Sequence, residues 1–269
     1  MPSLDPRAHV SALAHLAEDC AVSPGAYIGA HVQLAEGARI GPNAVLLDAT
    51  PGTGMTQVKP GVQVGANAVV HAGVTLATQS VVRPGAVVTR SVPPAAIVEG
   101  NPASIVGYVD TRHDTDAEIT RLASGAAPGL QPTGVQGVTF HRFPVIPDLR
   151  GSLTVGEFER QIPFTPQRYF MVFGVPNREI RGEHAHRVCH QFLICVRGSC
   201  AVVADDGHQR VEVMLDAPEL GIYLPPMTWG IQYKYSEDAL LLVFASHHYD
   251  AADYIRDYDD FLTLARTPR

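Results

Sequence analysis

An aliphatic residue recurs at every sixth position from Val10 to Val88, and this repeat restricts the fold of the first hundred residues more than any other feature. The series fails once, at Gly52, and resumes in register. A half-buried strand would alternate with period 2 and a helix with period 3.6, so neither fits. Three short strands per turn, one hexapeptide each, build a prism with a narrow aliphatic core. The sequence therefore predicts a β-helix. The aliphatic positions are Val10, Leu16, Val22, Ile28, Leu34, Ile40, Leu46, Val58, Val64, Val70, Leu76, Val82 and Val88.

The interruption, LDATPGTGMTQ at 47–57, contains one Pro and two Gly and predicts a loop that replaces one strand and its corners. No Gly-Lys-Ser/Thr follows it, so it is not a phosphate-binding P-loop.

Composition excludes several classes of function. A net charge of −7 and a pI near 5.9 do not suit a nucleic-acid surface. The first residues lack a signal peptide, no apolar run is long enough to span a membrane, and the four cysteines form no CxxC pair. We expect a cytoplasmic protein with reduced, buried thiols that binds neither nucleic acid nor membranes.

Aromatic residues divide the chain, because only Tyr27 and Tyr108 precede residue 139. We predict a β-helix domain over 1–108, a linker rich in Pro and Gly over 109–137, and a second domain over 138–269. The second domain reads as many short strands, with hairpin turns at Arg197-Gly198 and Asp206-Gly207 and a helix over 250–265, which favours a cupin or jelly-roll β-barrel. The fold class is all-β. The predicted strands are 167–175, 190–198, 200–207, 211–216, 221–225 and 239–246.

The most informative motif is Arg181-Gly-Glu-His184-Ala-His186. Alternate residues of a strand face the same side, so we expect the two histidines to share a pocket. Metal-binding cupins add a glutamate and a third histidine. Here Gln191 takes the glutamate position and the later strand has no histidine, so we predict a pocket without metal and with histidines free for acid–base work.

The hexapeptides and the run VVRPGAVVTRSVPPAAIVEGNPA (81–103) resemble the hexapeptide-repeat sugar N-acetyltransferases. The resemblance implies a trimer with acetyl-CoA as acyl donor in a groove between subunits, with Arg83, Arg90 and Asn101 near the cofactor. His71 takes a position where most coils carry Gly or Ala and is the candidate base; a plain surface histidine is the alternative, and His15 and His31 are weaker candidates.

The blocks RGEHAHRVCHQFLICVRGSC, GIYLPPMTW, LLVFAS and YDAADYIRDYDDFL are similar to the sugar 3,4-ketoisomerases, which convert dTDP-4-keto-6-deoxyglucose to its 3-keto isomer. The resemblance makes His184 the base and His186 its partner. It puts Arg150 and Gln191 beside the substrate and Arg181 at the phosphate or the enediolate. Trp229 would wall the pocket or stack on thymine. Gly230 stands where these isomerases have Arg or His, and Phe170 where they have Tyr.

We therefore expect a bifunctional nucleotide-sugar enzyme, a 3,4-ketoisomerase and an acetyl-CoA-dependent N-acetyltransferase acting on dTDP-sugars. The alternatives are that only the barrel is active and the β-helix is a trimerising scaffold, that the chain binds a sugar nucleotide without catalysis, or that it is an epimerase. Trimeric helices and dimeric barrels would combine as a homo-oligomer, and two trimers joined in this way would make a hexamer.

Overall fold

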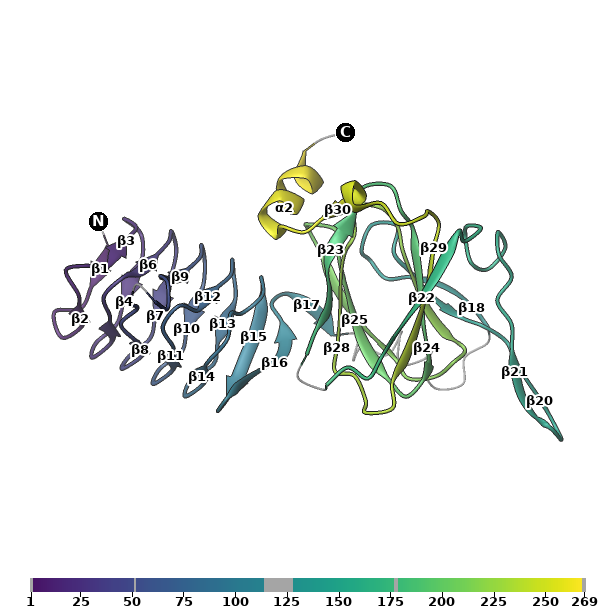
Figure 1. Ribbon diagram of the computed structural model, residues 1–269, viewed down its shortest axis with the longest axis horizontal. Helices are drawn as coiled ribbons and strands as arrows, with labels where there is room; N and C mark the ends of the chain where they lie inside the picture. Colours follow the sequence, from purple (N-terminus) through teal and green to yellow (C-terminus); the bar gives the residue numbers. More distant parts are fainter. Residues whose placement is uncertain (1, 51, 114–127, 177–178, 268–269) are drawn as a thin grey trace. The chain divides into compact units, whose positions relative to one another are not determined.

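The computed structural model describes residues 2–50, 52–113, 128–176 and 179–267. They form two compact units, Met1–Val109 and Asp110–Arg269, which we call the β-helix unit and the barrel unit. Figure 1 shows the coils of the first unit and the sheets of the second.

The β-helix unit has three faces, each a sheet whose strands run parallel, apart from one antiparallel strand at the end of the first face. The first face comprises β1 (Ser3–Leu4), β4 (Ala21–Val22), β7 (Arg39–Ile40), β10 (Gln63–Val64), β13 (Val81–Val82), β15 (Ala96–Gly100) and the antiparallel β16 (Ala103–Tyr108). The second comprises β2 (His9–Val10), β5 (Tyr27–Ile28), β8 (Val45–Leu46), β11 (Val69–Val70) and β14 (Val87–Val88). The third comprises β3 (His15–Leu16), β6 (Val32–Leu34), β9 (Thr56–Val58) and β12 (Thr75–Leu76).

The aliphatic series forms the core of this unit, which confirms the predicted register. From Val22 to Val88 each member of the series is at most 3% exposed. Val22 pairs with Ile40, eighteen residues on, whereas Ile40 pairs with Val64, twenty-four residues on. The additional hexapeptide is extruded between β8 and β9. The loop is therefore an insertion into a complete coil, and the expectation that it replaces a strand is wrong.

The barrel unit consists of two facing six-stranded sheets and a separate hairpin. One sheet has the order β17 (Thr111–His113), β26 (Arg210–Leu215), β25 (Cys200–Asp205), β28 (Trp229–Tyr233), β23 (Arg181–His186) and β30 (Tyr254–Ile255). The other has the order β18 (Gly129–Pro132), β19 (Thr139–Arg142), β27 (Leu220–Leu224), β24 (Gln191–Arg197), β29 (Leu240–Ala245) and β22 (Arg168–Phe173). The hairpin is β20 (Val145–Asp148) with β21 (Gly151–Thr154).

The expected strands exist, but one connection differs from the prediction. Asp206-Gly207 does turn a hairpin between β25 and β26, which pair with each other. Arg197-Gly198 does not, because β24 and β25 belong to different sheets. It carries the chain across the barrel instead, and apolar residues from both sheets fill the space between them.

The C-terminal segment also departs from the prediction of one helix over 250–265. A short 3-10 turn, η1 (Ala251–Asp253), leads into β30, and the helix α2 (Tyr258–Arg266) begins after Asp257, whose side chain accepts a hydrogen bond from the Asp260 amide. β30 pairs with β23, which brings this segment to the histidine motif.

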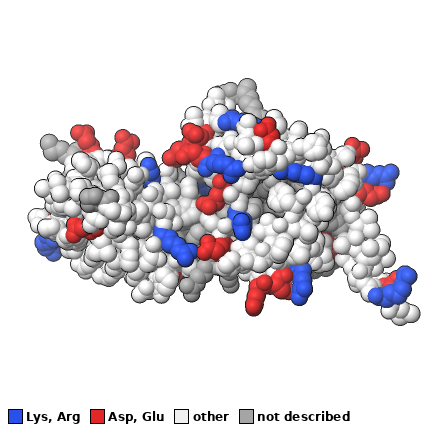
Figure 2. Space-filling view, viewed as in Figure 1, with Lys and Arg blue, Asp and Glu red and all other residues white. Residues whose placement is uncertain are grey.

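Within the predicted linker, Thr111–His113 pairs with β26 and Gly129–Pro132 pairs with β19, so both ends of that segment belong to barrel sheets. The backbone hydrogen bonds of these two strands therefore form despite the Pro and Gly content on which the linker prediction was based. The helical turn suggested for 110–125 lies mostly outside the described residues. No helix in the described part of the chain has the length and hydropathy to cross a membrane. On the face drawn in Figure 2, basic and acidic side chains are interspersed and form no continuous basic stripe.

Candidate active site

Strand β23 positions the two motif histidines. Glu183 adopts a positive φ of 53°, and the pairing with β28 shifts between Gly182 and His184, which is a bulge. His184 and His186 follow it with ring centroids 5.0 Å apart at an interplanar angle of 86°. Position 182 requires glycine, because a Cβ there would lie 2.5 Å from the Gly230 carbonyl oxygen. The strand therefore presents both rings to one region.

His184 is oriented as a neutral proton acceptor. Its Nδ1 lies 2.9 Å from the carbonyl oxygen of Gly182, which can only accept, so Nδ1 carries the proton and Nε2 carries the lone pair. Burial lowers the pKa of His184 to about 4. At neutral pH the ring is uncharged, with Nε2 available as a base.

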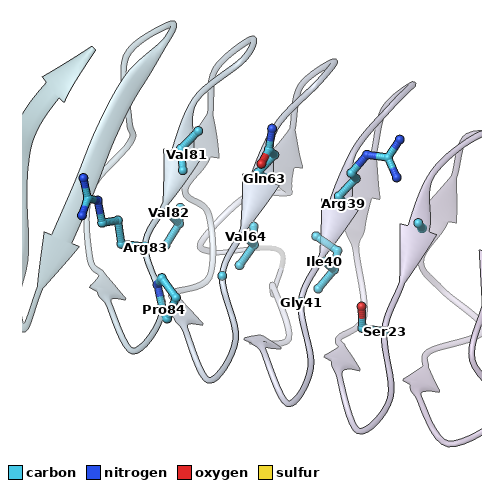
Figure 3. Close-up of a pocket in the computed structure, with 12 residues that line it drawn as sticks. Ser23, Arg39, Ile40, Gly41, Gln63, Val64, Val81, Val82, Arg83 and Pro84 are labelled. Carbon is cyan, nitrogen blue, oxygen red and sulfur yellow. The ribbon is translucent and has the colours of Figure 1, made fainter. Parts of the chain in front are cut away.

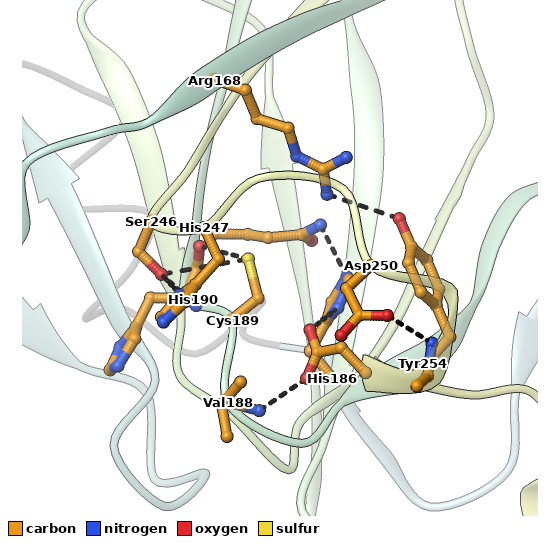
Figure 4. A network of polar contacts seen from close by, with 12 residues as sticks. Arg168, His186, Val188, Cys189, His190, Ser246, His247, Asp250 and Tyr254 are labelled. Carbon is orange, nitrogen blue, oxygen red and sulfur yellow. Dashed lines mark hydrogen bonds and ion pairs between the residues drawn. The ribbon is translucent and has the colours of Figure 1, made fainter.

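His186 is held more rigidly, in a buried chain of hydrogen bonds. Its Nδ1 donates to Oδ2 of Asp253 over 2.7 Å, and the other carboxylate oxygen accepts the Val188 amide over 2.8 Å. Nε2 lies 3.0 Å from Nε2 of Gln191, which then donates. Figure 4 shows this network. The carboxylate thus fixes the tautomer and orientation of the ring.

The protonation states of His186 and Asp253 are consistent with a neutral ring that carries its proton on Nδ1. Burial lowers the pKa of His186 against the opposing pull of Asp253. Burial alone would raise the pKa of Asp253, but hydrogen bonds from the Val188 amide and His186 outweigh it and lower that pKa. A neutral imidazole therefore donates to an ionised carboxylate.

The cavity beside the pair is small. It has about 10 Å³ of free space, roughly one water, and cannot hold a hexose. His186 is 5% exposed, whereas His184 is partly exposed and is the ring that a sugar can reach. The lining residues are His184, His186, Cys189, Gln191, Leu224, Pro225, Thr228, Gly230 and Gln232.

Three side chains can be considered as metal ligands. Donor atoms of His186, Cys189 and Asp253 all lie within 4.8 Å of one another. However, the histidine nitrogen and the carboxylate oxygen are already joined by a 2.7 Å hydrogen bond, which an ion would have to break. This donor set fits a metal poorly, and a pocket without metal stays a prediction.

Of the other residues predicted for this site, only Gln191 lies with the histidines. Trp229 points away: on β28 it alternates with Gly230, and its indole packs against Tyr258 and Phe261 beneath α2. The prediction that Trp229 walls the pocket or stacks on a base is therefore wrong. Arg181 is exposed at the start of β23, and its charge acts on Tyr235.

Arg150 is also remote from the histidines of its own chain. It turns the β20–β21 hairpin, its side chain is 90% exposed, and it pairs with Asp148 over 2.6 Å. In Figure 1 this hairpin extends away from the barrel on the side opposite β23.

Four residues at the site were not predicted from the sequence: Asp253, Tyr254, Arg168 and Arg256. The Tyr254 ring centroid lies 4.9 Å from that of His184 and 4.4 Å from that of His186. Asp253, Tyr254 and Arg256 were missed because 250–265 was read as one helix. Asp257, a good helix N-cap, was the signal that could have ended the preceding segment earlier.

The β-helix unit has a separate groove of about 480 Å³ on its first face, drawn in Figure 3. Arg39, Gln63 and Arg83 line it. Gly41 and Gly65 also line it, and a Cβ at either would collide with the backbone of the next coil. Arg83 also pairs with Glu99 over 3.5 Å. Arg39 was not predicted as a site residue, because the hexapeptide repeat identifies the inward aliphatic positions only.

The remaining predicted residues of this unit do not line the groove. His71 is exposed after β11, on the second face. Arg90 follows β14, and Asn101 lies in the β15–β16 turn, joined to Pro102 by a cis peptide bond; both are exposed.

Comparison with known proteins places relatives on both units. Residues 136–266 match the family model described as FdtA: WxcM-like, C-terminal. The chain is 43% identical over 119 residues to a TDP-4-oxo-6-deoxy-alpha-D-glucose-3,4-oxoisomerase of Aneurinibacillus thermoaerophilus, covering 44% of this chain and 86% of the relative. A solved 3,4-ketoisomerase from Helicobacter canadensis is 34% identical, with a TM-score of 0.47 and coverage of 49% of this chain and 98% of that one.

The β-helix side has a shorter match. The chain is 48% identical over 56 residues to a dTDP-3-amino-3,6-dideoxy-alpha-D-galactopyranose 3-N-acetyltransferase, also of Aneurinibacillus thermoaerophilus. This match covers 21% of the chain and 29% of that relative.

Proposed function

Because the chain belongs, through its barrel unit, to the FdtA, WxcM-like C-terminal family, we propose that this unit isomerises a TDP-linked 4-keto-6-deoxyhexose to the 3-keto sugar. The observation that carries the proposal is the unprotonated Nε2 of His184, directed by the hydrogen bond from Nδ1 to Gly182. The 43% identical oxoisomerase relative supports the substrate class.

The reaction moves two protons and needs no oxidant. His184 takes the proton from C3, and the electron pair forms an enediolate across C3 and C4. A proton returned to C4, with loss of the proton from the C3 hydroxyl, leaves the carbonyl at C3. Histidine can do both transfers near neutral pH. A base with a pKa of about 4 is weak, and an anionic substrate beside the ring would raise that pKa toward a more effective value.

The test is NMR of the purified chain with dTDP-4-keto-6-deoxyglucose in D2O. We expect a 3-keto product with deuterium at C4. Exchange at C3 or C5 without carbonyl migration would identify an epimerase instead. Binding of the sugar nucleotide with neither exchange nor product would identify a non-catalytic binding protein.

For the β-helix unit, we propose transfer of an acetyl group from acetyl-CoA to the amine of a dTDP-amino sugar. The amine attacks the thioester carbonyl and the CoA thiol leaves. The supporting observations are the groove with Arg39 and Arg83 and the short acetyltransferase match. Arg83, Arg90 and Asn101 are the proposed cofactor contacts and His71 the proposed base.

Acetyl transfer is tested by thiol release from acetyl-CoA with a dTDP-3-amino-3,6-dideoxyhexose. We expect Arg83→Gln to raise KM for acetyl-CoA about tenfold, because one charge-assisted phosphate contact is lost. Arg7→Gln, at an exposed arginine outside the groove, is the matched control. Wild-type chain that neither binds acetyl-CoA nor releases thiol would leave the β-helix as a scaffold.

We further propose a metal-free pocket and a homo-oligomer, trimeric through the β-helix and dimeric through the barrel, which together make a hexamer. The barrel contact is supported by apolar side chains exposed on β22 and the β20–β21 hairpin. It would also let Arg150 serve a partner's site. The exposed residues are Ile146, Leu149, Leu153, Tyr169 and Phe173.

A further inference from the structure

Two buried polar side chains in the small cavity beside the motif histidines have no partner. Gln232 and Thr228 both line this cavity, and they are 8% and 5% exposed. Neither side chain forms a hydrogen bond with any residue that the structure describes. Because a buried polar group without a partner costs stability, both groups are poised to gain from a ligand that enters the cavity.

The Gln232 amide lies beside the glycine that orients His184. On paired strands β23 and β28, His184 is opposite Gly230, and Gln232 faces the same side of β28 as Gly230 because it is two residues further on. A Cβ at Gly182 would lie 3.0 Å from Nε2 and 3.0 Å from Oε1 of Gln232. Glycine at position 182 therefore leaves room for the amide, and the carbonyl oxygen of the same glycine accepts the Nδ1 proton of His184.

The cavity has two glutamine amides, and they differ in what they contact. Nε2 of Gln191 lies 3.0 Å from Nε2 of His186, so one of its N–H groups is already engaged. Both N–H groups of Gln232 are free within the described part of the chain. Gln232 is therefore the amide that can donate to a ligand without breaking an existing hydrogen bond.

The size of the cavity limits what can reach this amide. Its free space of about 10 Å³ accepts roughly one water, and hence one oxygen atom but not a sugar ring. A hexose bound at the partly exposed ring of His184 could therefore insert one oxygen substituent into the cavity. The Gln232 amide and the Thr228 hydroxyl would meet that oxygen in place of water.

An isomerase needs a hydrogen-bond donor at one particular sugar oxygen. When a base removes the C3 proton, negative charge develops on the oxygen of C4, and a donor fixed beside that oxygen lowers the barrier. Arg181 was predicted for this role, but it is exposed at the start of β23. Its register partner on β28 is Gln232, whose side chain lies in the cavity instead.

We propose that the Gln232 amide donates a hydrogen bond to the C4 oxygen of the sugar and stabilises the enediolate there. This inference rests on the proposed isomerase function. His184 takes the C3 proton, the electron pair of that C–H bond forms the C3–C4 double bond, and the carbonyl electron pair moves onto the C4 oxygen. Gln232 keeps both of its protons throughout, and no bond to it forms or breaks.

The first test is the rate of isomerisation by Gln232→Met, which keeps the length of the side chain and removes the donor. We expect kcat for the 4-keto sugar nucleotide to fall about 10²- to 10³-fold, the usual effect of losing one donor to an oxyanion. Affinity for TDP, which has no hexose, should match the wild type and shows that the variant is folded. Gln209→Met, at an exposed glutamine in the β25–β26 turn, is the matched control and should keep the wild-type rate.

The second test follows the amide itself and does not need turnover or a folded variant of low activity. The side-chain amide resonances of Gln232, in a proton–nitrogen-15 NMR spectrum of the full chain, are assigned by their loss in Gln232→Met. We expect saturating dTDP-4-keto-6-deoxyglucose to move them, because an oxygen then accepts one of the N–H groups, whereas TDP alone should leave them in place.

The outcomes separate this inference from the proposed function. If the wild type isomerises the sugar and folded Gln232→Met keeps more than about a tenth of its kcat, Gln232 is not the donor although the function stands. If the wild type gives no 3-keto product but the sugar nucleotide still moves the Gln232 resonances, the amide binds the sugar and the isomerase proposal fails. A wild type that neither isomerises the sugar nor shows the resonance shift contradicts both.

Discussion

His184→Asn is expected to lower kcat for isomerisation by about 10²- to 10⁴-fold, the usual contribution of a general base. The asparagine amide can still donate to the Gly182 carbonyl, so the bulge of β23 should persist, but no lone pair of comparable basicity remains. The measurement is the initial rate of 3-keto product formation by NMR. TDP affinity, measured separately, should change little.

His208→Asn, at an exposed histidine in the β25–β26 turn, is the control and should retain the wild-type rate. If His184→Asn kept more than a tenth of the wild-type kcat, His184 would not be the base, and His186 would have to remove the C3 proton from its more enclosed position.

The pH dependence follows from the same burial. With the pKa of His184 at about 4, kcat/KM should stay level from neutral pH down to about pH 5 and fall as pH approaches 4.

The same burial makes folding stability depend on pH. In the unfolded chain the His184 ring takes up its proton near pH 6.5, whereas in the folded protein it does so near pH 4. The free energy of unfolding therefore keeps the full contribution of the neutral ring above pH 6.5 and loses it as pH falls toward 4. Burial lowers the pKa of His141 to about 4 as well, which adds to the same loss.

The period-six repeat predicted the β-helix core almost residue by residue, because a narrow prism constrains what each inward position can be. Alternation along a strand also predicted that His184 and His186 lie together. Neither the repeat nor the alternation predicts contacts between residues that are far apart in the sequence. Asp253 lies 67 residues from His186, and only the pairing of β30 with β23 brings them together. Trp229 was misplaced for a related reason: the motif suggested function, but its neighbour Gly230 takes the inward position on that strand.

Asp253→Asn is expected to lower kcat about 10²-fold with little change in KM, because it reverses the tautomer of His186. In the wild type one carboxylate oxygen accepts the Val188 amide and the other accepts Nδ1–H of His186. An asparagine has one oxygen. If its amide nitrogen faced Val188, two donors would meet, so the nitrogen must face His186. The proton then moves from Nδ1 to Nε2, and the Gln191 amide must turn over to accept it.

A purely structural role for Asp253 would not produce this pattern, which makes the tautomer the decisive readout. Nitrogen-15 NMR of the histidine rings should show His186 protonated at Nδ1 in the wild type and at Nε2 in the variant. Asp216→Asn, an exposed aspartate at the end of β26, is the matched control and should change neither tautomer nor rate. A slow variant that kept the wild-type tautomer would mean that Asp253 acts through its charge rather than by positioning His186, since the ring would then be oriented as before but without an ionised neighbour.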